Sequence, residues 1–192
     1  MDGNCWKLIL GFVPLMSISK PFNIIASATG TGSSGTISFG SIPQTYKSLI
    51  FMGQTHTDYA SGNVQCYVRL NSDSGAYYSQ KSIIYENGSG TGRNVNASNQ
   101  WQLEPIPSSD ASYYAGFLGW FELLIPNYTQ SSNWQMMQFA GGAMKDSTSS
   151  GIESQGGGAF YPAANAAVTT VEFILAAGNW TTDSKITMYG LG

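Results

Sequence analysis

The sequence predicts an all-β protein, an antiparallel β-sandwich of the jelly-roll type with an extended N-terminal arm. Apolar and polar residues alternate with a period of two in many short segments, which is typical of strands with one buried face. Clusters of Gly, Asn, Ser and Asp separate these segments, as turns do. Charged residues make up only 10% of the 192 residues, whereas helical surfaces are usually rich in Lys, Glu and Arg. Short strands with frequent turns and no helical pattern favour a sandwich or barrel.

The chain is expected to form one sandwich domain, residues 21–192, after an arm, residues 1–20. Residues 5–16 (CWKLILGFVPLM) are apolar, but a membrane span needs about 20 such residues, so no membrane partner is expected. A secretory leader is the alternative, although leaders normally begin with basic residues and Asp2 precedes this run. We expect the arm to dock on a neighbouring molecule or on its own domain through five residues, Trp6, Leu8, Ile9, Leu10 and Phe12.

Four strands are expected in the first part of the domain, at residues 22–29, 36–39, 47–55 and 64–70. The segment 64–70 (VQCYVRL) alternates throughout, and Leu49, Phe51 and Gly53 share one face of the strand before it. Pro43 lacks an N–H for a ladder, so residues 41–44 are expected in a loop or at a sheet edge.

The second part of the domain is expected to alternate strands with long loops. Strands are predicted at residues 77–85 and 134–140, and the near-continuous apolar run 115–125 predicts a strand that is either buried on both faces or central in its sheet. Loops are predicted at 86–100, at a segment bounded by Pro105 and Pro107, and at 145–158. The 86–100 loop is expected to form an exposed tip. Residues 168–192 contain two alternating runs, which predict a closing hairpin.

The charge of the chain argues against nucleic acid as a partner. Only eight Lys and Arg residues are present, scattered through the sequence, and the net charge is −3. A phosphate-binding face needs a concentration of basic side chains. Low charge also limits repulsion between copies, so the chain is expected to tolerate close packing in an assembly.

A catalytic role is not expected. His56 is the only histidine, and it could form a Ser–His–Asp arrangement with Asp58, but no Ser lies in a nucleophile-elbow sequence. Glycoside hydrolysis needs two carboxyl groups at a set separation. Glu122 and Glu172 are the pair to test for a hydrolase, because both fall within apolar runs. Outward-facing strand positions also explain these two residues.

No cofactor or metal is expected. One histidine and the two separated cysteines, Cys5 and Cys66, cannot build a zinc site from the usual ligands, and both thiols are expected to be free. Residues 71–75 (NSDSG) place oxygen ligands at alternating positions, as calcium loops do, but the distal Glu of such loops is missing. A plain turn between two strands is the favoured interpretation.

Aromatic residues offer two kinds of binding surface. Tyr113 and Tyr114, between a loop and a strand, are expected at an interface with another protein or with other copies, because aromatics are enriched at protein interfaces. Exposed aromatic rings can also stack on sugars. The candidates for such a face are Trp101, Tyr113, Tyr114, Trp134 and Trp180, although core packing is expected to take at least half of them.

Several segments resemble virion proteins of tailed bacteriophages, of the kind known as decoration, cement or minor structural proteins. The similar segments are 39–49 (FGSIPQTYKSL), 69–79 (RLNSDSGAYYS), 125–128 (IPNY) and 178–191 (GNWTTDSKITMYGL). The resemblance implies a non-enzymatic capsid decoration protein on the exterior of the virion. Its partners would be the major capsid protein, across whose subunit seams it binds, and its own copies in a dimer or trimer.

Two alternatives remain open from the sequence. A tail, baseplate or fibre component could use the same fold for assembly. A receptor- or glycan-binding module is the alternative from another class, with Trp101 and the loop 86–100 at its site.

Overall fold

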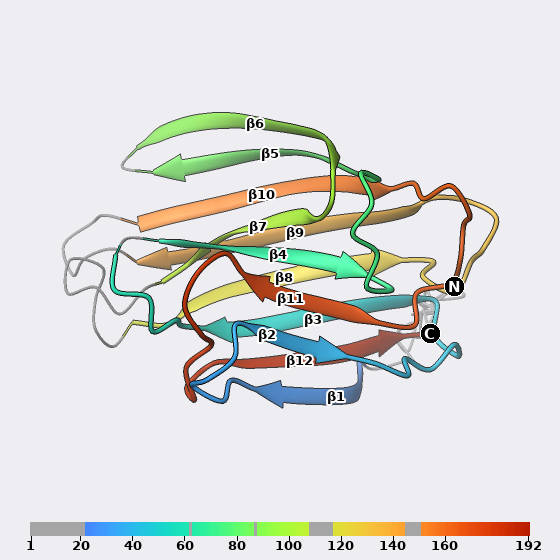
Figure 1. Ribbon diagram of the computed structural model, residues 1–192, viewed down its shortest axis with the longest axis horizontal. Coiled ribbons are helices and arrows are strands. Elements are labelled where there is room, and N and C mark those ends of the chain that lie inside the picture. The colour runs from blue at the N-terminus through green and yellow to red at the C-terminus, as the bar shows by residue number, and fades with distance from the viewer. Residues whose placement is uncertain (1–21, 62, 87, 108–116, 145–150) are drawn as a thin grey trace, which may run out of the picture.

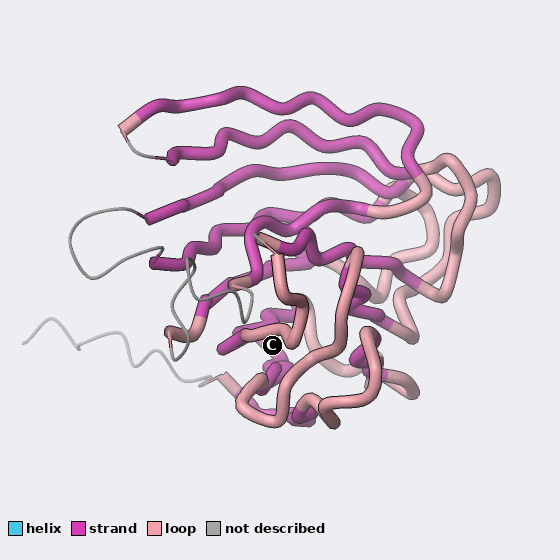
Figure 2. Tube along the Cα trace, turned by 60° about the vertical axis from the view of Figure 1, so that its left-hand side comes forward, coloured by secondary structure: helices cyan, strands magenta, loops and turns pink. Residues whose placement is uncertain are grey.

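The computed structural model describes residues 22–61, 63–86, 88–107, 117–144 and 151–192, and the account below concerns these residues alone. They form strands joined by turns and loops, without a helix (Figure 2), so the predicted antiparallel β-sandwich is confirmed. The strands are β1 Asn23–Thr29, β2 Thr36–Phe39, β3 Ser48–Thr55, β4 Val64–Leu70, β5 Tyr78–Glu86, β6 Ser89–Ser98, β7 Trp101–Ile106, β8 Gly119–Pro126, β9 Gln135–Met144, β10 Gly151–Phe160, β11 Val171–Leu175 and β12 Lys185–Leu191.

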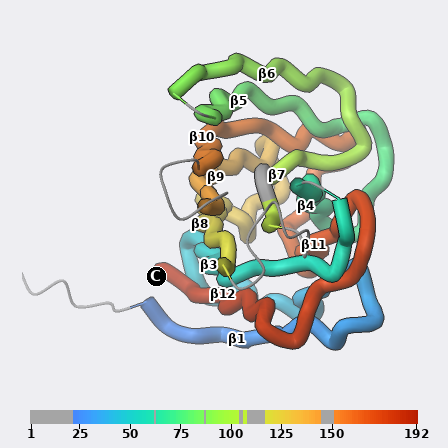
Figure 3. The backbone as a smooth tube through the Cα atoms, turned by 90° about the vertical axis from the view of Figure 1, so that its left-hand side faces the viewer, coloured from blue at the N-terminus to red at the C-terminus, as the bar shows by residue number. Residues whose placement is uncertain are grey.

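The strands form two sheets packed face to face (Figures 1 and 3). The large sheet has the order β1-β12-β3-β8-β9-β10-β5-β6, and the small sheet has the order β2-β11-β4-β7. Eight strands pair in a nested order, β1 with β12, β2 with β11, β3 with β8 and β4 with β7, all antiparallel. The other four strands form two hairpins, β5–β6 and β9–β10, which pair with each other through β10 and β5. These two hairpins, called the wing below, extend the large sheet beyond β8.

An aromatic cluster fills the space between the two sheets. Phe173 of β11 lies with its ring centroid 5.2 Å from that of Phe51 and 5.3 Å from that of Phe121. Phe39 of β2 meets both Phe51 and Phe173 edge to face. These rings come from four strands of both sheets, so burial of the alternating apolar positions joins the two layers.

The predicted closing hairpin is wrong. β11 lies in the small sheet and β12 in the large sheet, so residues 176–184 cross from one layer to the other. An isolated bridge between Thr57 and Trp180 holds this crossover against the end of β3. Alternation tells which face of a strand is buried, but both strands bury a face in the same core. It therefore could not tell whether they pair.

Two predicted loops are largely strands. The segment predicted as an exposed tip contains β6, the edge strand of the wing, and the segment 145–158 contributes most of β10. β10 has few large side chains because its neighbours leave no room. A Cβ on Gly156 would lie 2.5 Å from the Lys81 carbonyl oxygen, and one on Gly158 would lie 2.3 Å from that of Ser79. Pairing with β9 and β5 on both sides overrides the low strand propensity of glycine.

Two further predictions about strands need correction. The loop expected around Pro105 is the strand β7, which tolerates a proline because it is the edge of the small sheet and its register shifts between Val64 and Cys66 of its partner. The run 115–125 was expected to be a central strand, which it is, since β8 lies between β3 and β9, or else a strand buried on both faces. β8 instead buries one face and exposes the other, where Trp120 and Glu122 lie.

Candidate functional site

The outer face of the large sheet carries most of the exposed apolar side chains. Ten large hydrophobic residues are exposed among those described. Six occupy outward positions of the large sheet's strands, namely Ile24, Met52, Tyr85, Trp120, Met136 and Met144, while Phe22 and Trp134 directly precede β1 and β9. Exposed apolar side chains gathered on one face mark a binding surface.

An apolar groove of about 610 Å³ follows β10 on the outer face of the wing. The outward positions of β10 here are Gly157 and Ala159, which barely project from the sheet. Their partners on β9 are Gln138 and Met136, and the other wall comes from β5 and from Leu124 and Pro126 of β8. Small residues on one strand between longer ones on its neighbours therefore create this groove, called the wing groove below.

The walls of the wing groove are mostly uncharged. Lys81 of β5, opposite Gly157 in the ladder, is the one charged residue among those that line it. Met136 is half exposed, at 50%, and methionine adapts its shape to different partners. The groove therefore suits apolar side chains of another molecule, with a single ammonium group at its wall.

On the inside, the wing meets the small sheet mainly at β7, with one further bond from the Leu70 N–H of β4 to the Tyr78 hydroxyl of β5. The Gln80 side chain of β5 donates to the Gln102 carbonyl at 2.8 Å and accepts from the Gln102 N–H at 2.7 Å. Arg93 of β6 donates to the Gln102 side chain at 2.6 Å. Trp101 lies between β7 and the wing, where its indole donates to the Ala159 carbonyl at 3.2 Å. These contacts fix the inner face, which leaves the outer groove free to bind.

The structure corrects one predicted site residue, Trp101. Its side chain is fully buried, with an exposed fraction of 0%, and the Tyr78 ring packs edge-on against it at 5.5 Å. A buried ring cannot stack on a sugar. The prediction failed because a strand pattern alone does not show whether a tryptophan faces in or out. Trp180 is also buried, whereas Trp134 is exposed.

Several predicted contact residues lie outside the described residues. They are the arm residues Trp6, Leu8, Ile9, Leu10 and Phe12, and the loop residues Tyr113 and Tyr114.

The candidate catalytic residues do not converge. Glu122 points outward from β8 of the large sheet, and Glu172 points outward from β11 of the small sheet, so the two carboxyl groups face opposite sides of the sandwich. Asp58 is engaged by Asn179, whose backbone N–H and side-chain amide donate to it at 2.6 and 2.9 Å. The side-chain bond contributes most to lowering the pKa of Asp58 below its ordinary value of 3.8.

The segment 71–75 is a structural turn. The Asn71 side-chain oxygen accepts from the N–H groups of Thr169 and Thr170, and its amide donates to the Ala167 carbonyl. Asp73 accepts from the Gly75 N–H at 2.7 Å. No three His, Cys, Asp or Glu residues within the described ranges lie close enough to hold a metal ion. In the same ranges, no helix has the length and apolar character to cross a membrane.

Cys66 is a free, buried thiol, and burial raises its pKa well above the ordinary value. The thiol therefore stays protonated, and reaction with external reagents is disfavoured.

Sequence analysis missed Trp120 and Met136 as surface residues. The run 115–125 looked continuously apolar, yet Trp120 and Glu122 alternate with Phe121 and Leu123, and the polar Glu122 was the available signal of an outward face. Met136 lies beside a groove that Gly157 and Ala159 create. These small residues belong to a distant segment, so the sequence around Met136 gave no signal of the groove.

Comparison with known proteins identifies no relative of this chain. No family model matches this chain, and no curated protein or solved structure matches it.

Proposed function

We propose that the protein is a non-enzymatic virion component, a capsid decoration protein that binds on the exterior of a phage head across seams between major capsid protein subunits. The single observation that carries the proposal is the apolar groove of the wing, whose size and mostly uncharged lining suit apolar side chains of another macromolecule. The resemblance of segments 39–49 and 69–79 to phage virion proteins supplies the viral setting.

The nested order of eight strands supports the same proposal at the level of the fold. The pairs β1–β12, β2–β11, β3–β8 and β4–β7 are those obtained by rolling up one long antiparallel hairpin. We assign this arrangement as a jelly roll, which is common among viral proteins, with the wing hairpins as insertions.

The mechanism is mechanical. Apolar side chains of a capsid subunit fill the wing groove, and the other exposed residues on the outer face of the wing add contact area towards the roughly 1,600 Å² of a standard interface. Repeated over many sites, these contacts resist the internal pressure of packaged DNA. The low charge of the chain allows neighbouring copies to lie close together.

Further contacts are expected from the arm and from Tyr113 and Tyr114, and they stay predictions. Deleting residues 1–20 should abolish binding to particles yet leave a folded domain. Unchanged occupancy of such a truncated protein on capsids would refute the role of the arm.

Cryo-electron microscopy of particles that carry the protein tests the proposal directly. We expect many copies over the head, with the wing facing the capsid. A few copies at the tail would replace the proposal with the tail, baseplate or fibre alternative, and absence from particles would refute both.

A matched pair of variants tests the groove itself. Met136→Glu places a charge in the wing groove and should strongly reduce occupancy on the head. Met52→Glu makes the same change on the same face, but outside the groove, and should preserve occupancy. Equal occupancy of the two variants would show that the groove is not the contact.

A further inference from the structure

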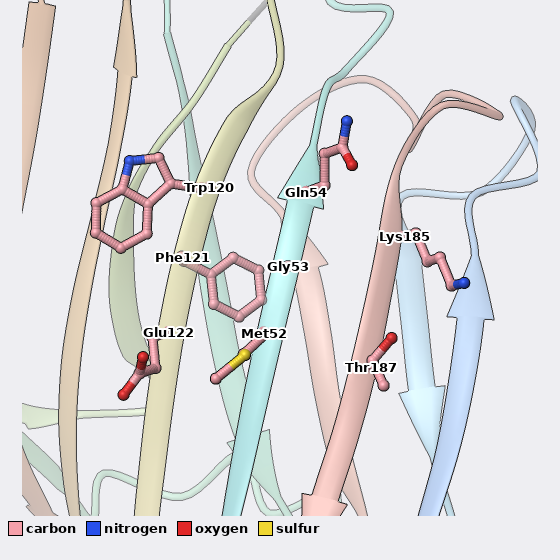
Figure 4. Close-up of a pocket in the computed structure, with 8 residues that line it drawn as sticks. All are labelled: Met52, Gly53, Gln54, Trp120, Phe121, Glu122, Lys185 and Thr187. Atoms are coloured by element: carbon pink, nitrogen blue, oxygen red, sulfur yellow. The ribbon is translucent and has the colours of Figure 1, made fainter. Parts of the chain in front are cut away.

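A second hollow lies on the half of the outer face away from the wing (Figure 4). It has a volume of about 360 Å³, at the lower end of the range for small-ligand sites. Two rows of side chains cross β8, β3 and β12 here, because each member is the ladder partner of the next. The first row is Trp120, Gln54 and Lys185, and the second is Glu122, Met52 and Thr187.

Trp120 forms an aromatic platform in this hollow. Its ladder partner on β9 is Gly142, and a Cβ on that glycine would lie 3.2 Å from the indole nitrogen of Trp120. The indole therefore extends over the place that a side chain would fill, while 51% of the residue stays exposed. The face of an aromatic ring carries partial negative charge, which attracts the C–H groups on the flat side of a pyranose ring.

Polar side chains without partners of their own line the rest of the hollow, Glu122 beside the indole and Gln54 and Lys185 on the next two strands (Figure 4). Within the described residues, the side chains of Gln54, Glu122 and Lys185 make no hydrogen bond or ion pair. Glu122 follows Trp120 by two residues and therefore projects from the same face of β8. The indole leans to the β9 side of β8, whereas Gln54 and Lys185 lie on β3 and β12 (Figure 4). The first row spans two strand spacings, about 10 Å, so a ligand of several sugar rings can reach these donors and acceptors from Trp120.

The chemistry of the hollow selects one class of ligand. The single carboxylate and single ammonium group balance, which gives no basis for binding phosphates. A purely apolar anchor would leave Gln54, Glu122 and Lys185 desolvated without partners, which is unfavourable. A saccharide presents an apolar face to the ring and a rim of hydroxyl groups to the polar side chains, so it satisfies both kinds of group.

We propose that this hollow binds a neutral oligosaccharide, with one sugar ring stacked on Trp120 beside Glu122 and hydroxyl groups of the neighbouring rings bonded to Gln54 and Lys185. The site goes beyond capsid decoration. It lies over β8, β3 and β12, whereas the wing groove follows β10. A protein docked through its wing can therefore present the hollow to a glycan on another surface.

Titration of the full-length protein with cellohexaose, maltohexaose, mannohexaose and chitohexaose, followed by tryptophan fluorescence and calorimetry, tests the proposal. At least one of the four should give saturable binding. Trp120→Ala should weaken that binding about tenfold or more, as expected for a ring that stacks on an aromatic side chain. Glu122→Gln should weaken it several-fold, because a neutral amide accepts hydrogen bonds less strongly than a carboxylate.

Two controls keep the experiment decisive. Trp134→Ala removes another exposed indole from the same side of the molecule, and Met136→Glu alters the wing groove. Both should bind the saccharide as the unmodified protein does, and thermal unfolding should verify that all four variants are folded. Saturable binding to none of the four saccharides, full binding by Trp120→Ala, or an equal loss in Trp134→Ala would each overturn the proposal.

Discussion

The near half of the large sheet (β1, β12, β3 and β8) and the wing are held in place by partly different interactions. The near half lies against the small sheet through the aromatic cluster around Phe51, Phe121 and Phe173, all buried. The wing is covered from inside mainly by β7, and its inner positions combine buried Tyr78 and Phe160 with Gln80, Ser154 and glycines. Hydrophobic burial therefore holds both parts, but the interior of the wing also contains polar side chains that bond to β7.

This difference shows how the sandwich gains a binding surface without a change in its central packing. The wing hairpins enter the chain between β4 and β7 and between β8 and β11, so the nested pairs of the sandwich stay intact. Because the wing is held through its inner face, its outer face is free to form the groove. The variants below test whether the two halves are separate in stability as well as in structure.

The largest effect is expected from Trp101→Ala, which should lower the free energy of unfolding by about 3–5 kcal/mol. The substitution opens a cavity between β7 and the wing and removes the hydrogen bond to the Ala159 carbonyl. Hydrogen exchange should show a greater loss of protection in β10, β5 and β6 than in β3 and β12, because the wing loses its main anchor.

Phe173→Ala provides the contrast to this variant. Its ring lies between the two sheets and contacts Phe39, Phe51 and Phe121, so its loss should cost a similar free energy but lower protection in both halves. If Trp101→Ala also lowered protection evenly, the wing would belong to the same cooperative unit as the near half.

An intermediate effect is expected from Gly158→Ala in the wing. The added Cβ would lie 2.3 Å from the Ser79 carbonyl oxygen and 3.0 Å from the indole nitrogen of Trp101, so the ladder or the anchor must shift. Overpacking of this kind costs about 1–3 kcal/mol, which chemical denaturation can measure.

The matched control is Gly92→Ala on β6, where nothing lies within 4 Å of the added Cβ. This variant should change stability by less than about 0.5 kcal/mol. Equal effects of the two substitutions would mean that glycine at position 158 is not required by close packing against Trp101.

The sequence predicted the strands of the nested sandwich better than those of the wing. The bounds of β2 and β4 agree with the prediction, and β3 differs by one residue, because apolar alternation reports directly on burial in a two-layer core. β6 and β10 were predicted as loops because Gly, Ser and Asn dominate them. Their strand structure comes from pairing with distant segments, which local composition does not record.

The candidate site depends even more on distant pairing. The wing groove arises because Gly157 lies between Gln138 and Lys81 in the ladders, and these three residues belong to separate segments of the chain. The same holds for the row of Trp120, Gln54 and Lys185. Only the register of the sheet brings such residues together, so sequence analysis could name tryptophans but not choose Trp120 over the buried Trp101.

The smallest effect is expected at the end of the near half, where Asp58 joins the turn after β3 to the crossover between β11 and β12. The folded pKa of Asp58 lies below 3.8, chiefly because the Asn179 side chain donates to it. The charged carboxylate therefore stabilises the fold above about pH 4. That contribution is lost as the pH falls through the folded pKa.

Asp58→Asn should remove this pH dependence, because the side chain of Asn does not ionise. The NH2 group of the new side chain would also face the donating amide of Asn179. The site is exposed, so we expect the variant's Tm to be only about 1–2 °C lower near neutral pH, with the difference vanishing in acid. Asp183→Asn changes an exposed carboxylate in the same crossover and should not reproduce this pattern. If the Tm of Asp58→Asn differed from that of the unmodified protein by the same amount at every pH, the ionised Asp58 carboxylate would not stabilise this end of the near half.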